Sequence, residues 1–162
     1  MKINVLFLDD LFSDTFRETI SKEQLVWDDN WAAALENAFE DQRGSEEYTF
    51  DVVKSGDIDG WQSLVETNRP DIVLMDLYWP VHAVHKYQDE RRGCDISLDT
   101  IKQIRETFPA LPVICYTFKP QSKIIDAAYN AGASFFLEKV ALALPEVHNS
   151  LKYICIHLLR EK

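Results

Sequence analysis

Four short apolar runs recur along the chain, and each is predicted to form a β-strand that is buried on both faces. They are rich in β-branched or aromatic residues and lack a clean alternation of apolar and polar positions, which is typical of strands inside a parallel sheet. These runs cover residues 3–8, 71–76, 111–117 and 133–139. A fifth run, residues 48–55, alternates more and is predicted to lie at an edge of the sheet.

Apolar residues at helical spacing separate the strands. The predicted helices cover residues 31–39, 61–65, 98–108, 124–131 and 144–158. Pro109 ends one of them, and Gly132 suits the position just after another. Strands and helices that alternate in this way predict a three-layer α/β fold, in which a doubly wound, five-stranded parallel sheet carries helices on both faces.

The length of 162 residues and the hydrophobic content of 46% predict a single domain over residues 1–162. Two stretches are longer than the alternating pattern requires. They are residues 12–30, before or within the first helix, and residues 78–97, between the third strand and the helix that follows it. Loops this long in a compact domain are usually functional or disordered, so we expect one or the other for each stretch.

The charge balance narrows the choice of partners. The formal net charge is -10, and nucleic-acid affinity rests largely on Lys and Arg side chains that neutralise phosphates. We therefore expect no nucleic-acid partner, and a protein or a cation fits better.

The cysteines and the N-terminus bear on localisation. Cys94, Cys115 and Cys155 are an odd number without CxxC spacing, which favours a reducing compartment. The apolar stretch at the N-terminus meets two aspartates before it is long enough for a signal peptide or a membrane span. The sequence therefore predicts a cytoplasmic protein with no membrane partner.

Charged and hydroxyl side chains stand where the predicted core strands end. Asp9 and Asp10 follow the first strand, Asp76 ends the third, Thr117 ends the fourth and Lys139 ends the fifth. In the strand order 2-1-3-4-5, the first and third strands are neighbours, and ligands bind beyond their carboxyl ends. Three carboxylates would then converge and repel one another unless a proton or a divalent cation such as Mg²⁺ intervenes. With Lys139 and Thr117 nearby, the set predicts a phosphoryl-transfer site in which Asp76 is the nucleophile.

The sequence resembles a response-regulator receiver domain, the phospho-accepting part of two-component signalling, which has a flavodoxin-like fold. The resemblance rests on “VLFLDD”, “DIVLMDLYWP”, “VICYT” and “AGASFFLEK” and covers nearly the whole chain. It implies that Asp9 and Asp10 hold Mg²⁺ together with the acceptor Asp76, and that the backbone carbonyl of Tyr78 completes the metal site. Pro80 matches a proline that is usual four residues after the acceptor.

The same resemblance assigns roles at the last two strands. Thr117 and Lys139 would bind the phosphoryl group, and Phe136 would occupy the aromatic switch position. Phe118 departs from the family pattern, because receivers usually have a small residue directly after the switch hydroxyl. A ring at this position could restrict the access of a phosphodonor or of water to Asp76. The resemblance further implies that Gly93 is the glycine that usually follows the proline, displaced by the extra residues.

The resemblance also implies partners and an output. The phosphodonor would be a histidine kinase or a phosphotransfer protein, and the signal would pass to an unknown downstream protein through the face built from the fourth helix, the fifth strand and the last helix. The chain would not be an enzyme, since its chemistry is limited to its own phosphorylation and dephosphorylation.

Three alternatives compete with this interpretation. The first is a receiver-like interaction module that is not phosphorylated, because Phe118 and the long stretch 78–97 cover its acceptor. The second is a Mg²⁺-dependent phosphohydrolase with an aspartate nucleophile, which the sequence disfavours because such enzymes have Asp-x-Asp after the first strand and this chain has an adjacent pair. The third is a zinc site at His82, His85 and Cys94, which lacks a fourth ligand at suitable spacing.

Overall fold

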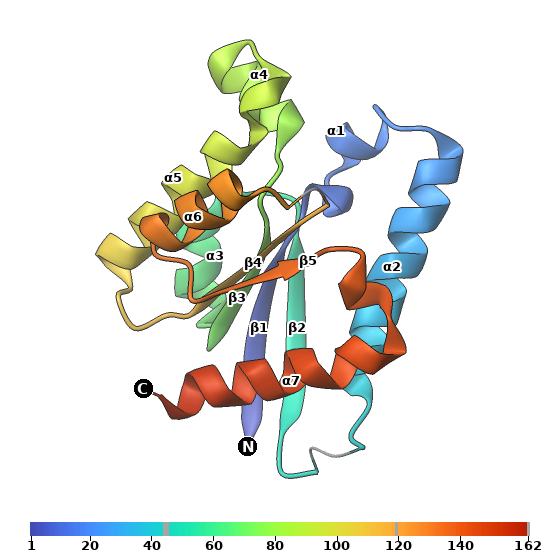
Figure 1. Ribbon diagram of the computed structural model, residues 1–162, viewed down its shortest axis with the longest axis vertical. Coiled ribbons are helices and arrows are strands. Elements are labelled where there is room, and N and C mark those ends of the chain that lie inside the picture. Colours follow the sequence, from blue (N-terminus) through green and yellow to red (C-terminus); the bar gives the residue numbers. More distant parts are fainter. Residues whose placement is uncertain (44–45, 119, 162) are drawn as a thin grey trace.

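The computed structural model describes residues 1–43, 46–118 and 120–161, and its strands and helices alternate along the chain (Figure 1). The strands are β1 (Lys2–Leu8), β2 (Thr49–Ser55), β3 (Ile72–Asp76), β4 (Val113–Thr117) and β5 (Phe135–Glu138). The α-helices are α1 (Asp14–Arg17), α2 (Lys22–Glu40), α3 (Trp61–Asn68), α4 (Pro80–Tyr87), α5 (Gly93–Thr107), α6 (Ser122–Ala131) and α7 (Pro145–Arg160). Short 3₁₀ helices occur at η1 (Asp10–Phe12), η2 (Glu90–Arg92) and η3 (Ala141–Ala143).

All five strands are parallel, and their order in the sheet is β2-β1-β3-β4-β5. The predicted fold class and strand order are therefore confirmed. The register places Leu8 of β1 beside Met75 of β3, so that the residues following both strands emerge at one edge. At the same edge Thr117 of β4 lies beside Glu138 of β5, which brings Lys139 to the adjoining position.

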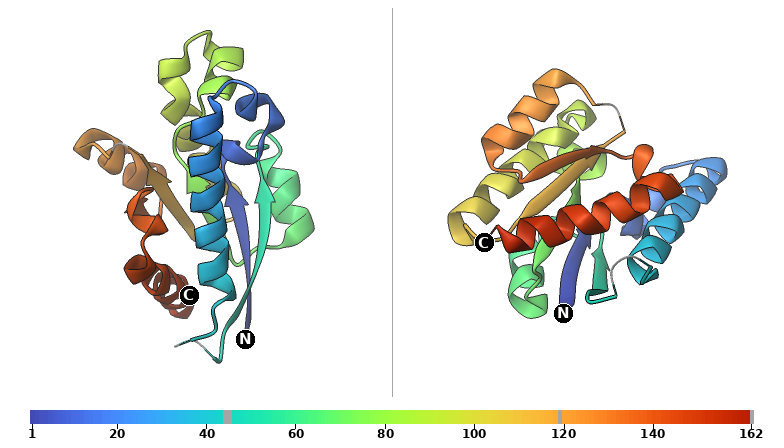
Figure 2. Two further views of the ribbon diagram at one scale, coloured as in Figure 1. Left: turned by 90° about the vertical axis from the view of Figure 1, so that its right-hand side faces the viewer. Right: turned by 60° about the horizontal axis from the view of Figure 1, so that its bottom comes forward.

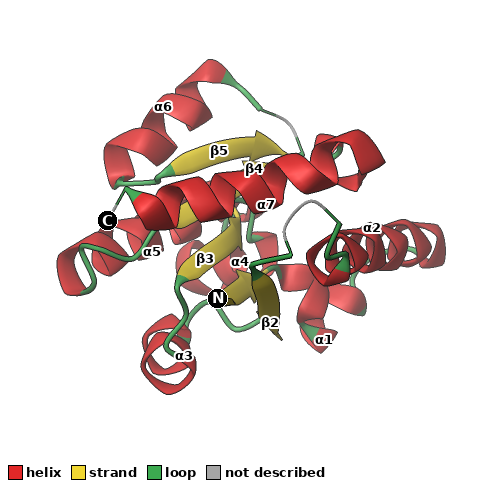
Figure 3. Cartoon of the chain, turned by 90° about the horizontal axis from the view of Figure 1, so that it is seen from below, coloured by secondary structure: helices red, strands yellow, loops and turns green. Residues whose placement is uncertain are grey.

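Helices cover both faces of the sheet and form two apolar cores. One core joins the sheet to α3, α5 and α6, and the other joins it to α2 and α7. Figure 3 shows these two groups of helices on opposite sides of the strands. Buried runs such as β3 and β4 have no exposed residue because both of their faces are covered, which explains their continuous apolar sequence.

The stretch 12–30 is mostly helical. α2 starts at Lys22, nine residues before the predicted start at Trp31, and α1 precedes it. The Ser21 side chain caps α2 by accepting a hydrogen bond from the backbone N–H of Gln24 at 3.2 Å, a signal that apolar periodicity does not reveal. Of the two placements left open for this stretch, before or within the first helix, the second holds for residues 22–30, which are part of α2, while α1 and the turn before α2 precede it.

The stretch 78–97 is also largely helical, so the prediction of a long loop there is wrong. Pro80 occupies the first turn of α4, where its fixed φ suits a helix start, and Gln88 ends α4 in the left-handed region at φ 56°. After η2, α5 starts at Gly93 and not at the predicted Leu98. Figure 2 shows α4 and α1 at the end of the molecule opposite the N-terminus, beyond the carboxyl ends of the strands.

Candidate functional site

Three buried carboxyl groups meet at the carboxyl edge of the sheet. Asp9 follows β1, Asp10 opens η1 and Asp76 ends β3. Because β1 and β3 are neighbours, oxygen atoms of the three side chains lie within 4.8 Å of one another. Their exposed fractions are only 0%, 4% and 5%. The structure therefore brings together the three acids that the sequence predicts as one site.

Lys139 supplies a positive charge to this cluster. Its Nζ lies 3.0 Å from Oδ2 of Asp9 and 3.2 Å from Oδ2 of Asp76, and the residue is 4% exposed. Burial by itself would lower the pKa of Lys139, but the charges of Asp76 and Asp9 outweigh burial and raise the pKa above its ordinary value. The ammonium group is thus a fixed charge beside the predicted acceptor.

Aromatic rings enclose the lysine. Its Nζ lies 4.7 Å from the ring centroid of Trp31, 5.5 Å from that of Tyr116 and 5.6 Å from that of Phe118. The Trp31 indole donates a hydrogen bond to the Lys139 carbonyl at 2.7 Å, and the Tyr116 hydroxyl donates to Oδ2 of Asp9 at 2.5 Å. These contacts hold the ammonium group in one position and favour its charged form.

The acids carry perturbed pKa values because they are buried together. Burial first, and then the charges of Asp76 and Asp9, raise the pKa of Asp10 to about 10. Burial also raises the pKa of Asp76 to about 7, although Lys139 opposes this shift. Carboxyl groups this close hold a proton unless a cation neutralises them, and three oxygen ligands match the preference of Mg²⁺. The residues present therefore fit a hard divalent cation.

Asp76 is also tied to the chain that follows it. Its Oδ1 accepts a hydrogen bond from the backbone N–H of Tyr78 at 3.2 Å, and its carbonyl accepts one from the Trp79 indole at 2.6 Å. Gly93 lies so close that an added Cβ would be 2.6 Å from the Tyr78 ring. This close approach requires a glycine at position 93. The role of the Tyr78 carbonyl as a metal ligand stays a prediction.

The other predicted residues lie on β4 and β5. Thr117 is buried at the end of β4, and its carbonyl accepts a hydrogen bond from the Lys139 backbone N–H at 2.9 Å. Phe136 lies opposite Cys115 in the sheet and packs, half-buried, against the core formed with α3, α5 and α6. Both positions suit the predicted roles in phosphate binding and switching, and those roles stay predictions.

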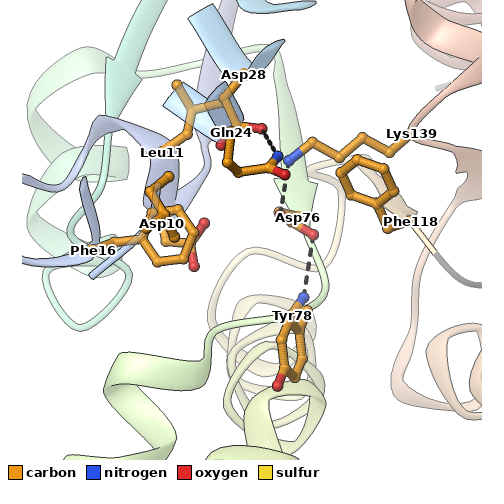
Figure 4. Close-up of a pocket in the computed structure, with 10 residues that line it drawn as sticks. Asp10, Leu11, Phe16, Gln24, Asp28, Asp76, Tyr78, Phe118 and Lys139 are labelled. Carbon is orange, nitrogen blue, oxygen red and sulfur yellow. Dashed lines mark hydrogen bonds and ion pairs between the residues drawn. The ribbon is translucent and has the colours of Figure 1, made fainter. Parts of the chain in front are cut away.

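A cavity of about 370 Å³ opens onto Asp10, Asp76 and Lys139 (Figure 4). Much of its wall is apolar, with side chains of Leu11, Phe16, Ile20 and Phe118. The Phe118 ring is 45% exposed and lies 4.9 Å, centroid to centroid, from Trp27 of α2. The structure thus places Phe118 in the wall of the cavity that reaches Asp76, with its ring partly exposed to solvent.

Two polar side chains of α2, Gln24 and Asp28, also line the cavity, and the sequence analysis did not single them out. Asp28 is 4% exposed, and its burial raises its pKa. The signal was present in the sequence, because residues 24, 28, 31 and 35 share one helical face. It was missed because the predicted helix began at Trp31. Tyr116 was also missed, since its hydroxyl acts within an otherwise apolar strand.

The proposed zinc ligands do not form a comparable cluster. Within the part of the chain that the structure describes, the group Asp9, Asp10 and Asp76 is the one set of three or more candidate ligands close enough to share an ion. His82 instead packs edge-on against Trp79, with ring centroids 5.3 Å apart.

Comparison with known proteins places the fold. No protein-family model matches the sequence, and no curated protein matches it either. A putative response regulator from Chloroflexus aurantiacus superposes with a TM-score of 0.62 at 20% identity, covering 99% of both chains. The signal receiver domain of a putative Luxo repressor protein from Vibrio parahaemolyticus gives 0.61 at 17% identity, over 99% of this chain and 92% of that one. A response regulator from Thermotoga maritima gives 0.59 at 17% identity, over 99% of both.

The chain therefore has the fold of response-regulator receiver domains, and the resemblance inferred from the strand-end motifs is confirmed at the level of the fold. In residues 1–43, 46–118 and 120–161, no helix combines the length and the apolar character that crossing a membrane requires.

Proposed function

We propose that this protein is a response-regulator receiver that accepts a phosphoryl group on Asp76 with the help of Mg²⁺. One observation carries the proposal: Asp9, Asp10 and Asp76 share a buried cluster, with Lys139 in ion-pair contact with two of them. A buried group of three acids is costly for folding and is explained when it binds a cation and a phosphoryl group. The receiver fold supports the proposal independently.

Each side chain of the site has a separate role in phosphoryl transfer. An oxygen of the Asp76 carboxylate attacks phosphorus, a P–O bond forms, and the bond from phosphorus to the donor breaks. The Lys139 ammonium, already beside Asp76, meets the charge on the phosphoryl oxygens, and the Thr117 hydroxyl donates a hydrogen bond to one of them. Asp9, Asp10, Asp76 and the Tyr78 carbonyl would hold Mg²⁺, which when bound offsets the negative charge of the phosphoryl group.

The partners follow from this chemistry. The donor is a phosphohistidine on a histidine kinase or a phosphotransfer protein, and the receptor of the signal is a downstream protein in the cytoplasm. Phosphorylation biases Thr117 and Phe136 and thereby changes the surface of α6, β5 and α7. The chain acts on itself and on no other substrate, so it is a signalling component and not an enzyme.

A second candidate is an interaction module that shares the fold and is never phosphorylated. The burial of the acceptor favours it, since Asp76 is only 5% exposed and Phe118 lines the cavity beside it. Under this alternative the acidic cluster would bind Mg²⁺ without accepting a phosphoryl group.

The test is a measurement of intact mass after incubation with acetyl phosphate and Mg²⁺, and separately with a candidate kinase. We expect the wild type to gain the mass of one phosphoryl group and Asp76→Asn to gain none, because an amide is not a nucleophile of this kind. Asp126→Asn, which changes an exposed acid of α6, is the matched control and should label like the wild type. Labelling of Asp76→Asn would show that the acceptor is misassigned. A wild type that binds Mg²⁺ but is never labelled would favour the interaction module.

A further inference from the structure

The side chains on the inward face of α2 change from apolar to polar where the helix passes the edge of the sheet. Its lower part presents Trp31, Leu35 and Phe39 to the core shared with α7. One turn above Trp31 the same face presents Asp28, and one turn further it presents Gln24, an exposed residue that lines the cavity. Asp28 is 4% exposed, nearly as buried as Trp31 at 2%. A carboxyl group therefore occupies a position where an apolar side chain would be expected.

This carboxyl group costs stability and has little local compensation. Its one described hydrogen bond comes from the Gln24 amide, which donates to Oδ1 at 2.9 Å. Among the described lysines and arginines none lies within ion-pair distance of it, and the charge of Lys139 offsets only part of the burial that raises the pKa of Asp28. Burying a carboxyl group without an ionic partner is unfavourable, so its presence points to a function rather than to packing.

Asp28 faces the same cavity as the acceptor. Figure 4 shows Gln24 and Asp28 reaching into this space from α2, while Asp76 reaches it from the end of β3. A phosphoryl group on Asp76 would extend into the cavity. Water that attacks in line must approach phosphorus from the side opposite the Asp76 oxygen, which is the cavity side.

We infer that Asp28 is a further catalytic residue of this site, which orients the water molecule that hydrolyses the phosphoaspartate. The inference rests on the proposed phosphorylation of Asp76. The water oxygen bonds to phosphorus, the bond from phosphorus to the Asp76 oxygen breaks, and the electron pair stays on the Asp76 carboxylate. The proton of the water passes to the Asp28 carboxylate and then to solvent, and inorganic phosphate leaves.

The rest of the wall does not offer this chemistry. Leu11, Phe16, Ile20 and Phe118 are apolar, Asp10 belongs to the cation site, and Lys139 carries its proton. The Tyr78 phenol also keeps its proton, because burial raises its pKa above the ordinary value. Gln24 acts as a positioning residue, because its amide fixes one oxygen of the Asp28 carboxylate. The receiver thus carries on its own α2 a pair of side chains that limits the lifetime of its phosphorylated state.

The experiment separates the two half-reactions. Wild type, Asp28→Asn and Gln24→Leu are labelled with acetyl phosphate and Mg²⁺, the donor is removed by rapid desalting, and the loss of the phosphoryl group is followed by intact mass. We expect Asp28→Asn to lengthen the half-life at least about tenfold, in the range of a lost general base. Gln24→Leu should lengthen it by about threefold, because the carboxylate remains but is less fixed. The initial rate of phosphorylation should stay within about twofold of the wild type in both.

Glu23→Gln is the matched control, since it removes one negative charge from an exposed position of the same helix. It should leave the half-life unchanged. An unchanged half-life in both Asp28→Asn and Gln24→Leu would overturn the inference. A rise in the phosphorylation rate of Asp28→Asn by the same factor as its half-life would also overturn it, because that result indicates a general effect of charge on both reactions. Labelled proteins with equal half-lives would overturn the inference alone, whereas the absence of label in every protein would overturn the proposed function as well.

Discussion

Two segments lie beyond the carboxyl ends of the strands, and they meet the acidic site in different ways. The first segment, residues 12–30, runs over the site, and its side chains Phe16, Ile20, Gln24 and Asp28 form part of the cavity wall. The second segment, residues 78–97, is joined to the site at its base, while α4 projects away from the sheet (Figure 1). The base is secured by Trp79 and by the close packing of Gly93 on Tyr78.

The difference shows two uses of added helix at one edge of a sheet. The first segment covers charged groups, so that burial is the largest cause of the raised pKa of Asp10 and of Asp28. It therefore acts on the chemistry of the site. The second segment contributes a buried anchor and leaves exposed apolar residues such as Val84 on its outer part. The base of the second segment therefore stabilises the fold, and its outer part, α4, presents a surface to solvent.

The largest effect is expected at the base of the second segment. Trp79 is fully buried, and its indole donates to the Asp76 carbonyl at 2.6 Å. Trp79→Ala should lower the free energy of unfolding by about 3–5 kcal/mol, because it removes a large buried ring and leaves a cavity. Urea unfolding followed by circular dichroism measures this change. Trp27→Ala, at a tryptophan of the first segment that is 36% exposed, is the control and should cost about 1 kcal/mol or less. Equal losses of unfolding free energy in the two variants would contradict the contrast between the buried base of the second segment and the first segment.

The next effect concerns the acid that the first segment helps to bury. The pKa of Asp10 is about 10 in the folded protein, against an ordinary value of 3.8. Between these values the folded state binds more protons than the unfolded state, so stability falls as pH rises. In a chelator, raising the pH from 5 to 8 should lower the free energy of unfolding by on the order of 4 kcal/mol, because one proton more is bound in the folded state over these three pH units, at about 1.4 kcal/mol for each unit. Asp10→Asn lacks the ionisable group, so its stability should depend less on pH.

Urea unfolding at several pH values, in a chelator and in excess Mg²⁺, measures this linkage. Excess Mg²⁺ should reduce the loss in the wild type, because a cation that binds the ionised cluster stabilises the folded state. Asp126→Asn is the matched control and should follow the wild type. If wild type and Asp10→Asn show the same slope in the chelator, Asp10 is not held protonated by its surroundings.

The sequence was most informative where one physical pattern decides the structure. Five apolar runs gave the strands, and the acids at their ends converge because parallel neighbours end at one edge. The same reasoning was least informative for the two added segments. α4 is short, and its N-terminus depends on Pro80 at the first turn and not on an apolar stripe. Apolar periodicity therefore assigned it to a loop.

The site residues that the sequence patterns did not identify were missed for a similar reason. Asp28 and Gln24 are polar residues on the same helical face as Trp31 and Leu35, so apolar spacing alone placed the start of the helix at Trp31, after both of them. The hydrogen bond from Tyr116 to Asp9 joins residues 107 positions apart, and only the strand register brings them together. Local sequence patterns therefore predict the residues at the strand ends, while the groups that surround them depend on tertiary packing.

The smallest effect compares two exposed apolar residues, one at the cavity and one on the second segment. Phe118 is 45% exposed and Val84 is 47% exposed, so alanine at either position should change stability by about 1 kcal/mol or less. Their consequences for phosphorylation should differ. The Phe118 ring lines the cavity and lies 5.6 Å from Nζ of Lys139, whereas Val84 lies on α4.

Phe118→Ala should therefore speed phosphorylation by acetyl phosphate and hydrolysis of the phosphoaspartate together, each by about threefold to tenfold, which corresponds to roughly 1 kcal/mol of barrier. Acetyl phosphate must bring its phosphorus to Asp76, and water must reach the phosphorus of the phosphoaspartate, through the space that the ring restricts, and the charges around Asp76 do not change. The affinity for Mg²⁺ should stay the same, and Val84→Ala should keep both rates within about twofold. Time courses of intact mass measure both reactions. If Phe118→Ala changes hydrolysis alone, the ring shields the phosphoryl group from water without hindering the donor. If Val84→Ala matches it, the second segment also controls access, and the contrast between the two segments fails.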